Sequence, residues 1–277
     1  MASAFQPDPL GHVLHAERTF FGTYKVRLDP AGEYRTLSHG TTLHGIQSIV
    51  QARSTEALSY YHPTGPLGDV FGMRRAAAGR SEVAVVGLGV GSVATYRRPE
   101  ERWTFFEIDP AVETIARNTE YFSYLADCGD ACQVIIGDAR QSLAARQSHY
   151  GLIVLDAFSS DAIPVHLLTR EALDVYLARL APEGLLAFHV SNRHLDLEPV
   201  LAKIAENAGL VSYIRRDQVA GDVESGKRSS DWLVMASRTE HLEPLASDRR
   251  WRRSRYSPAA DLWTDDFSNI LTLLLRK

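Results

Sequence analysis

The sequence predicts an α/β fold, in which a doubly wound parallel sheet of seven strands follows a small N-terminal β appendage. From residue 82 onward, short β-rich runs alternate with helix-like stretches. These runs are almost continuously apolar, which is typical of parallel strands that are buried on both faces. Residues 18–50 differ, because Val, Tyr, Thr and Leu alternate with polar residues around the turn "DPAGE", which indicates a hairpin.

Each element of this prediction has its own segment. We expect strands at 82–87, 103–109, 132–138, 151–158, 184–190, 211–216 and 231–237. We expect helices at 110–122, 167–182 and 197–210, the last of which begins after Asp196 as a cap and ends at Gly209. The Pro/Gly-rich segment 62–68 connects the two parts, so residues 1–70 are expected to form the appendage and residues 71–277 the main domain.

Composition and charge exclude several classes of protein. The chain has 277 residues, a formal net charge of −4 and an isoelectric point near 6.2, so no overall charge favours a nucleic-acid partner. The first residues lack a basic segment followed by an apolar run, and no apolar stretch reaches the roughly 18 residues that span a membrane. We therefore expect a cytoplasmic protein with no nucleic-acid partner and no membrane span.

Three groups of residues are interpreted as structural. Cys128 and Cys132 are expected to be thiols without a metal, because no second cysteine pair matches them. His39 and His44 lie five residues apart, whereas side chains on one strand face are separated by even numbers, so no metal site is expected. The run "RRWRRSR" at 249–255 is interpreted as an ion-paired surface, with contact to RNA or an anionic membrane as the alternative.

A glycine-rich turn follows the first expected strand. Gly87, Gly89 and Gly91 in "VAVVGLGVGS" end a buried run and open the next helix, where glycine allows a sharp turn and close approach to a ligand. The dinucleotide pattern G-x-G-x-x-G has its last position at Ser92 in this chain. This departure favours a cofactor without a pyrophosphate over NAD or FAD.

Acidic residues end the next three strands in order. Glu107 lies 20 residues after Gly87 and could accept both ribose hydroxyls, whereas Asp109 better fits the alternative role of a helix cap. Asp138 and the Ala139 amide could bind adenine, although Asp138 could equally cap a helix. Asp156 emerges from an apolar run, and such partial desolvation suits a general base. The ordered set predicts a bound nucleoside such as S-adenosylmethionine.

These motifs together resemble the spermidine synthase (polyamine aminopropyltransferase) family. The resemblance covers "GLGVGS", "FFEIDP", "IIGDAR", "LDAFSSDAIPVHLLT" and "WTDDFSN". Within this family, the chain is similar to the branch of domains related to membrane transporter-like segments. It implies a β-hairpin domain on a seven-stranded Rossmann-like body of the class I methyltransferase type. It also implies that the three glycines line the methionine portion of the donor, that Glu107 binds ribose, that Asp138 and Ala139 bind adenine, and that Asp156 deprotonates the attacking amine.

The chain also departs from the family pattern. The aspartate that the resemblance places in the glycine turn is Val90, and the second acid of the catalytic loop, Asp161, follows Asp156 by five residues instead of three. Asp161 and the pair Asp265 and Asp266 are candidates for holding a cationic acceptor, although the pair could instead cap the last helix. Tyr60 and Tyr61 are candidates for the family tyrosine and for an apolar channel wall, with plain core packing as the alternative.

The resulting hypothesis is a transferase of polyamine biosynthesis. It would move an aminopropyl or related alkyl group from decarboxylated S-adenosylmethionine, or from S-adenosylmethionine, to an amine, without a metal. The alternatives are an S-adenosylmethionine-dependent methyltransferase of small molecules and a non-catalytic domain that binds a nucleoside or polyamine. The family resemblance further implies a homodimer or homotetramer.

Overall fold

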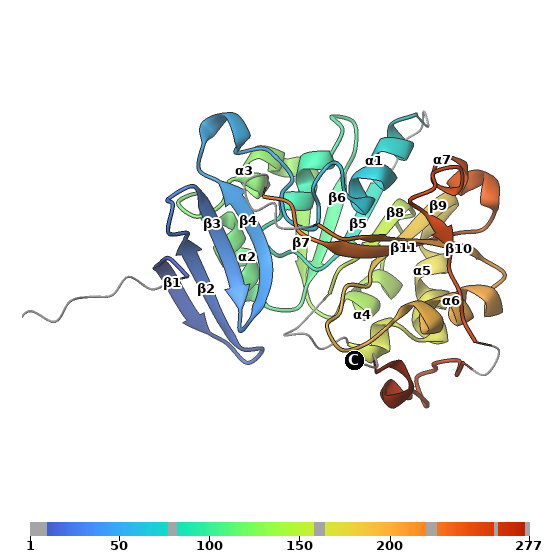
Figure 1. Ribbon diagram of the computed structural model, residues 1–277. Coiled ribbons are helices and arrows are strands. Elements are labelled where there is room, and N and C mark those ends of the chain that lie inside the picture. Colours follow the sequence, from blue (N-terminus) through green and yellow to red (C-terminus); the bar gives the residue numbers. More distant parts are fainter. Residues whose placement is uncertain (1–9, 77–81, 158–163, 220–225, 258–259, 275–277) are drawn as a thin grey trace, which may run out of the picture.

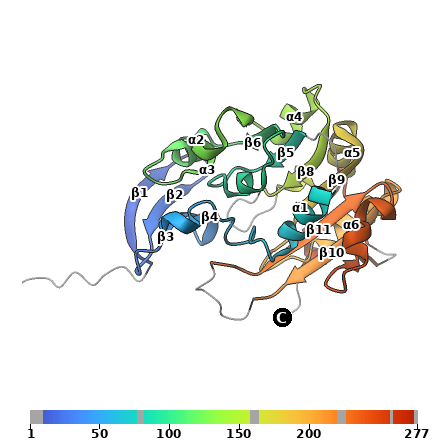
Figure 2. The same cartoon turned by 90° about the horizontal axis from the view of Figure 1, so that it is seen from above.

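A computed structural model describes residues 10–76, 82–157, 164–219, 226–257 and 260–274. These residues form a four-stranded antiparallel sheet followed by a larger mixed sheet with helices on both faces (Figure 1). Seen from above, the small sheet lies beside α2 and α3 at one end of the molecule, while β10, β11 and α6 lie at the other end (Figure 2). The predicted α/β fold with an N-terminal β unit is confirmed. The predicted domain boundary after residue 70 stays a prediction.

The N-terminal sheet has two more hairpins than the sequence predicted. Its strands run in the order β1-β2-β3-β4 and are β1 (His12–Arg18), β2 (Thr23–Leu28), β3 (Tyr34–His39) and β4 (Thr42–Ser48). Asp29 Oδ1 accepts the backbone N–H groups of Glu33 and Tyr34, which closes the "DPAGE" turn. The expected single strand after this turn is divided at Gly40, whose φ of +57° allows the chain to reverse.

The large sheet contains all seven predicted strands. Its order is β12-β10-β11-β9-β8-β5-β6-β7, with β5 (Glu82–Val86), β6 (Trp103–Glu107), β7 (Cys132–Ile136), β8 (Tyr150–Leu155), β9 (Leu180–His189), β10 (Val211–Asp217), β11 (Ser230–Ala236) and the two-residue β12 (Arg252–Arg253). The pairs among β5 to β9 are parallel, whereas β11 runs antiparallel to both of its neighbours. The sheet is thus mostly parallel, and the exception is β11, which follows β10 in a hairpin and pairs with β9.

The helices occupy the connections between strands. They are α1 (Pro66–Ala76), α2 (Pro110–Arg117), α3 (Tyr124–Cys128), α4 (Ala139–Ala144), α5 (Arg170–Ala178), α6 (Glu198–Asn207) and α7 (Glu243–Ala246). Short 3₁₀ helices are η1 (Gln51–Arg53), η2 (Ser92–Tyr96), η3 (Gly129–Ala131), η4 (Val165–Leu167), η5 (Thr239–Leu242) and η6 (Ile270–Leu273). The expected helices at 110–122 and 167–182 are thus shorter, and β9 begins only two residues after α5 ends.

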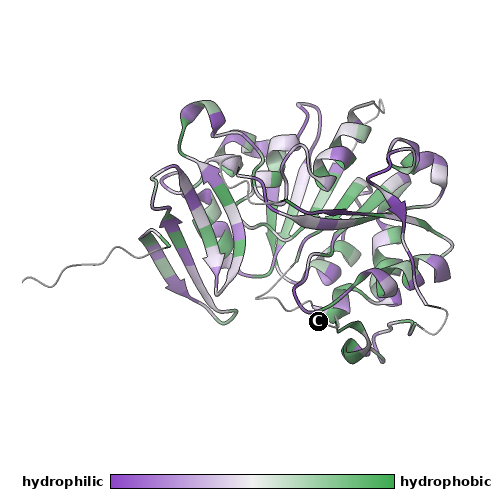
Figure 3. Cartoon of the chain, in the orientation of Figure 1, coloured by the Kyte–Doolittle hydropathy of each residue, from purple (hydrophilic) through white to green (hydrophobic). Residues whose placement is uncertain are grey.

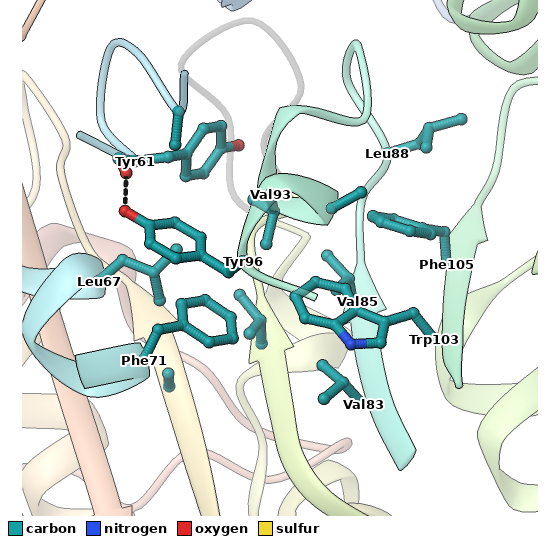
Figure 4. Close-up of a cluster of buried hydrophobic side chains, with 14 of the residues drawn as sticks. Tyr61, Leu67, Phe71, Val83, Val85, Leu88, Val93, Tyr96, Trp103 and Phe105 are labelled. Atoms are coloured by element: carbon teal, nitrogen blue, oxygen red, sulfur yellow. Dashed lines mark hydrogen bonds between the residues drawn. The ribbon is translucent and has the colours of Figure 1, made fainter. Parts of the chain in front are cut away.

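The core consists of two apolar layers that the central sheet separates. Val83 and Val85 of β5 face one layer with α1, α2 and α3, while Ala84 and Val86 face the other with α4, α5 and α6. Figure 3 shows the resulting apolar band along the central strands. In the first layer the Phe71 ring stacks on Tyr96 with centroids 4.4 Å apart (Figure 4). Burial on both faces explains why the strands are apolar without alternation.

Two structural interpretations from the sequence have an outcome. The structure joins Cys128 to Cys132 in a disulfide, so the expectation of thiols was wrong; the turn η3 brings their Cα atoms to 5.7 Å. The arginine run is ion-paired as expected, because Arg250 pairs with Asp248 and Arg252 contacts Glu198. Within the described ranges, no helix is long and apolar enough to cross a membrane.

Candidate active site

The carboxyl ends of four neighbouring strands meet at one edge of the large sheet. In space their order is β8, β5, β6 and β7. Backbone hydrogen bonds continue past the strands, because Asp156 N donates to Val86 O at 2.8 Å and Gly137 N donates to Glu107 O at 2.9 Å. The residues that follow each strand are therefore held side by side, at the edge where ligands bind in open α/β sheets.

The glycine turn is fixed by contacts with other segments of the chain. Gly87, Gly89 and Gly91 have φ values of +98°, +54° and +81°, a region that favours glycine. A Cβ at Gly87 would lie 2.3 Å from Asp156 O, and a Cβ at Gly89 would lie 2.3 Å from His44 O in β4. The turn thus packs between the end of β8 and strand β4 of the N-terminal sheet. It opens the five-residue 3₁₀ helix η2, which corrects the expectation of a regular helix there.

Glu107 holds the same turn from the end of β6. Its Oε2 accepts Leu88 N at 3.0 Å, and its Oε1 accepts Asp109 N at 3.0 Å. Burial raises the pKa of Glu107, and these two backbone donors partly oppose the rise. Each carboxylate oxygen still has a further lone pair. As the sequence indicated, Asp109 is the helix cap, since its side chain accepts Ala111 N.

Asp138 adopts the capping geometry that was its alternative role. Its Oδ1 accepts Gln141 N at 2.8 Å at the start of α4, directly before Ala139, and its Oδ2 lies 2.9 Å from His166 Nε2. A cap and a ligand contact are compatible, because each carboxylate oxygen can accept more than one hydrogen bond. The adenine role of Asp138 and Ala139 therefore stays a prediction.

Asp156 occupies an enclosed position at the end of β8. It directly follows β8, and its side chain is only 10% exposed. Tyr61 OH donates to Oδ2, and His189 Nδ1 lies 2.6 Å from Oδ1. Burial, with the Asp156 carboxylate beside it, raises the pKa of Tyr61 well above its usual value, so the phenol stays a donor. Asp156 is thus a carboxylate fixed by two neighbouring side chains.

The two predicted tyrosines are consecutive residues of a turn near Asp156. Tyr61 is buried, and its carbonyl accepts Tyr96 OH (Figure 4). Tyr60 OH donates to Leu43 O at 2.9 Å, and its ring lies 5.2 Å from that of His189. Burial, then the nearby Asp156 charge, raises the pKa of Tyr60 to about 12. Both tyrosines therefore lie near the Asp156 carboxylate, while their role in binding an acceptor stays a prediction.

The other predicted acceptor-binding acids lie elsewhere. Asp161 falls outside the described residues. Asp265 pairs with Arg140 of α4 through two hydrogen bonds of 2.7 Å, and Asp266 is exposed beside it. The hydrogen bonds from Arg140, then that from Thr169, lower the pKa of Asp265 to about 2. The structure thus brings Asp265 to the Asp138 side of the site and not to Asp156.

Sequence reasoning missed the residues behind Asp156. His189 ends β9, where the parallel register pairs Leu155 with Phe188 and so brings the next residues, Asp156 and His189, together. Ser191 follows and contacts His189 Nε2. The available signal was the position of a histidine at the end of the fifth apolar run, beside the strand that carries Asp156. Among the described residues, no group of three or more His, Cys, Asp or Glu side chains could hold a metal ion.

Comparison with known proteins agrees with this geometry. No family model matches the chain. A polyamine aminopropyltransferase of Vibrio vulnificus (strain CMCP6) is 36% identical over 110 residues, which are 38% of this chain and 36% of the relative. The match therefore spans about a third of the curated relative.

Solved structures match over most of the chain. A probable spermidine synthase from Corynebacterium glutamicum superposes with a TM-score of 0.68 at 15% identity, covering 94% of this chain and 98% of the other. The chain therefore shares the fold of this probable spermidine synthase. Spermidine synthase from Thermotoga maritima gives a TM-score of 0.60 at 10% identity over 89% and 81% of the two chains. A spermidine synthase in complex with the transition state analogue AdoDATO gives 0.58 at 10% identity over 89% and 80%.

These matches bear on the predicted fold and family. The spermidine synthase-like resemblance is confirmed, as is the Rossmann-like fold with an N-terminal antiparallel sheet. The link to domains related to membrane transporter-like segments stays a prediction.

Proposed function

We propose that this spermidine synthase-like chain transfers an aminopropyl or related alkyl group from an S-adenosyl donor to an amine. The observation that carries the proposal is the buried Asp156 carboxylate beside the glycine turn, held by Tyr61 and His189. Support also comes from the partial match to a polyamine aminopropyltransferase and from a structural neighbour that was solved with a transition state analogue. The resulting enzyme is a transferase.

The proposed reaction needs a base and correct alignment. Asp156 takes a proton from the acceptor amine, whose lone pair attacks the carbon attached to the sulfonium sulfur. A C–N bond forms, the C–S bond breaks, and its electron pair goes to sulfur, which leaves as a neutral thioether. The sulfonium already makes the carbon electrophilic, so the protein supplies orientation and proton removal and no covalent nucleophile.

The donor would lie across the strand tips. We place its ribose at Glu107, whose oxygens each keep a lone pair after accepting one backbone N–H. We place its adenine at Asp138 and Ala139, and the methionine-derived portion at the glycine turn. For the acceptor amine, Tyr60, Tyr61 and Asp161 stay in the proposal, whereas Asp265 is engaged by Arg140.

A methyl transfer is the second candidate, and Val90 is the observation that favours it. Val90 is buried and packs against Gly45 of β4, so the glycine turn presents no carboxylate at this position. A donor with a cationic propylamine would lose a charge-assisted contact worth about 1.5–3 kcal/mol there. S-adenosylmethionine as the donor would then be used for its methyl group.

Titrations with different donors distinguish aminopropyl transfer from methyl transfer. Calorimetry with decarboxylated S-adenosylmethionine, S-adenosylmethionine and methylthioadenosine, followed by mass spectrometry of amine mixtures, should give tighter binding of the decarboxylated donor and an aminopropylated product. Asp156→Asn should lose turnover at least a hundredfold and retain donor binding, while Asp130→Asn, an exposed site before β7, should behave as wild type. Methylated products would support the second candidate. An Asp156→Asn variant with full activity would remove Asp156 from the mechanism.

The assembly and location stay predictions. We propose a homodimer or homotetramer, which sedimentation measurements can test. We also propose a cytoplasmic location. The Cys128–Cys132 disulfide is evidence against this location, because disulfides are rare in the reducing cytoplasm.

A further inference from the structure

A chain of buried and partly buried polar groups lies behind the Asp156 carboxylate. Asp231 N donates to Ser191 Oγ at 2.8 Å, and Ser191 Oγ lies 2.7 Å from His189 Nε2. On the opposite side of the imidazole, His189 Nδ1 lies 2.6 Å from Asp156 Oδ1. The chain therefore extends from a backbone amide of β11 to the carboxylate at the end of β8.

The direction of the hydrogen bonds in this chain follows from chemistry. Ser191 Oγ already accepts the Asp231 amide, so its own hydrogen is available for His189 Nε2. An ionised Asp156 can only accept, so the hydrogen between it and the ring belongs to His189 Nδ1. Both ends of the ring thus favour the same neutral tautomer, with Nδ1 as the donor.

Packing holds the imidazole in this orientation. His189 pairs directly with Trp232 in the antiparallel register of β9 and β11, which places both side chains on one face of the sheet. Their rings stack with centroids 4.7 Å apart and planes 15° from parallel. Tyr60 lies near the ring as well, and His189 is 7% exposed. The ring has little room to turn.

We propose that His189 is a positioning residue for Asp156. It donates from Nδ1 to Oδ1, while Ser191 maintains the tautomer and Trp232 fixes the ring plane. Together with Tyr61 on Oδ2, this contact holds the carboxylate in one orientation for proton removal. The inference rests on the proposed function, because it assigns Asp156 the role of base.

The pH dependence involves the charged and titratable groups that the described part of the chain places near this carboxylate. The Asp156 charge raises the pKa values of Tyr60, Tyr61 and His44, and the His189 charge lowers that of Asp231. Arg193 and Arg228 lie near Tyr60 and lower its pKa. Loss of the His189 donor favours the protonated form of a buried carboxylate over the ionised form. The acid side of the activity profile should then move to higher pH.

Two substitutions at one position test the inference. His189→Leu removes the donor, whereas the side-chain amide of His189→Asn can donate from nearly the position of Nδ1. We expect His189→Leu to lower kcat ten- to a hundredfold with KM within threefold, and to move the acid limb upward by about one pH unit. His189→Asn should recover most of the rate and the wild-type acid limb. Equal losses in both variants, or none in His189→Leu, would overturn the inference.

Controls separate positioning from folding. His149→Leu changes an exposed histidine at the start of β8, the opposite end of the strand from Asp156, and should leave kcat unchanged. If His189→Leu does not fold, Ser191→Ala gives the second measurement. It should reduce kcat several-fold with an unchanged KM, and an unchanged kcat would count against the inference.

A readout without activity separates this inference from the proposed function. In ¹⁵N NMR of histidine-labelled wild-type protein, with the signal assigned by its absence in His189→Asn, His189 should be the neutral Nδ1–H tautomer. Ser191→Ala should shift its tautomer balance. An Nε2–H tautomer in the wild type overturns the inference even if transfer occurs. Conversely, the Nδ1–H tautomer in a protein that transfers no group would support the hydrogen-bond chain and refute the proposed function.

Discussion

The contact between Gly45 and Val90 connects the N-terminal sheet to the glycine turn and can be tested by a double-mutant cycle. A Cβ added at Gly45 would lie 2.3 Å from Val90 Cγ2 and 2.8 Å from Cγ1. Gly45 has no positive φ, so an alanine there meets a steric obstacle and no backbone strain. Gly45→Ala should therefore destabilise the protein through overpacking, by about 1–3 kcal/mol.

The complementary change removes the obstacle. Val90→Ala deletes two buried methyl groups and should cost about 2–3 kcal/mol by itself. In the double variant the new methyl at position 45 occupies part of that space, with the remaining Cβ of position 90 at 3.0 Å. The double variant should then lose about 1–3 kcal/mol less than the sum of the single variants.

Urea unfolding followed by tryptophan fluorescence measures these free energies, provided the m-values stay equal. Gly72→Ala is the matched control, because Gly72 lies exposed in α1 with nothing within 4 Å of an added Cβ. It should stabilise the protein by about 0.5–1 kcal/mol, the reverse of Gly45→Ala. Additive losses in the double variant, or a neutral Gly45→Ala, would refute the packing of the turn against β4.

Further predictions concern the turn, a buried histidine and the disulfide. A methyl group added by Gly89→Ala would lie 2.3 Å from His44 O, whereas Gly209 also has a positive φ but has open space around it. Gly89→Ala should therefore lower the free energy of unfolding by at least about 2 kcal/mol more than Gly209→Ala does, a difference in the upper part of the range for overpacking. Equal losses in urea unfolding would contradict this. Burial, then the nearby His39, lowers the pKa of His44 to about 4, so below its ordinary value near 6.5 the unfolded chain binds more protons. The free energy of unfolding should fall by at most about 3 kcal/mol as the pH is lowered from 6.5 to 4. A free energy of unfolding that stays constant over this range, or that depends on pH as strongly in His44→Phe as in the wild type, would refute the role of His44. Thiol titration of the unreduced, unfolded chain should find neither Cys128 nor Cys132 free, whereas two reactive thiols would contradict the disulfide.

Much of the fold could be predicted because its signals are local. The seven strands of the large sheet are apolar runs that differ sharply from their surroundings, and their burial on both faces accounts for that pattern. The starts of α2, α4 and α5 follow capping chemistry, as at Asp109. The strand-tip acids Glu107, Asp138 and Asp156 could be identified for the same reason, since each lies directly after an apolar run.

Errors arose where a local pattern has more than one solution in space. The segment after the "DPAGE" turn has strand composition throughout, and only the reversal at Gly40 divides it into β3 and β4. Cys128 and Cys132 carry no sequence signal that separates thiols from a disulfide. Asp265 was a candidate for the acceptor site, but its partner Arg140 is 125 residues away in the chain.

The sequence by itself determined which residues form strands and which acids end them, because burial and capping act over a few neighbouring residues. Only the tertiary structure decided the strand order, the antiparallel direction of β11 and the partners of each acid. His189 is the clearest case: its position at the end of an apolar run does not fix its partner, and it meets Asp156 because β8 and β9 pair in parallel with one register. Register is a property of long-range pairing, so the side-chain contacts that depend on it exist only in the folded chain.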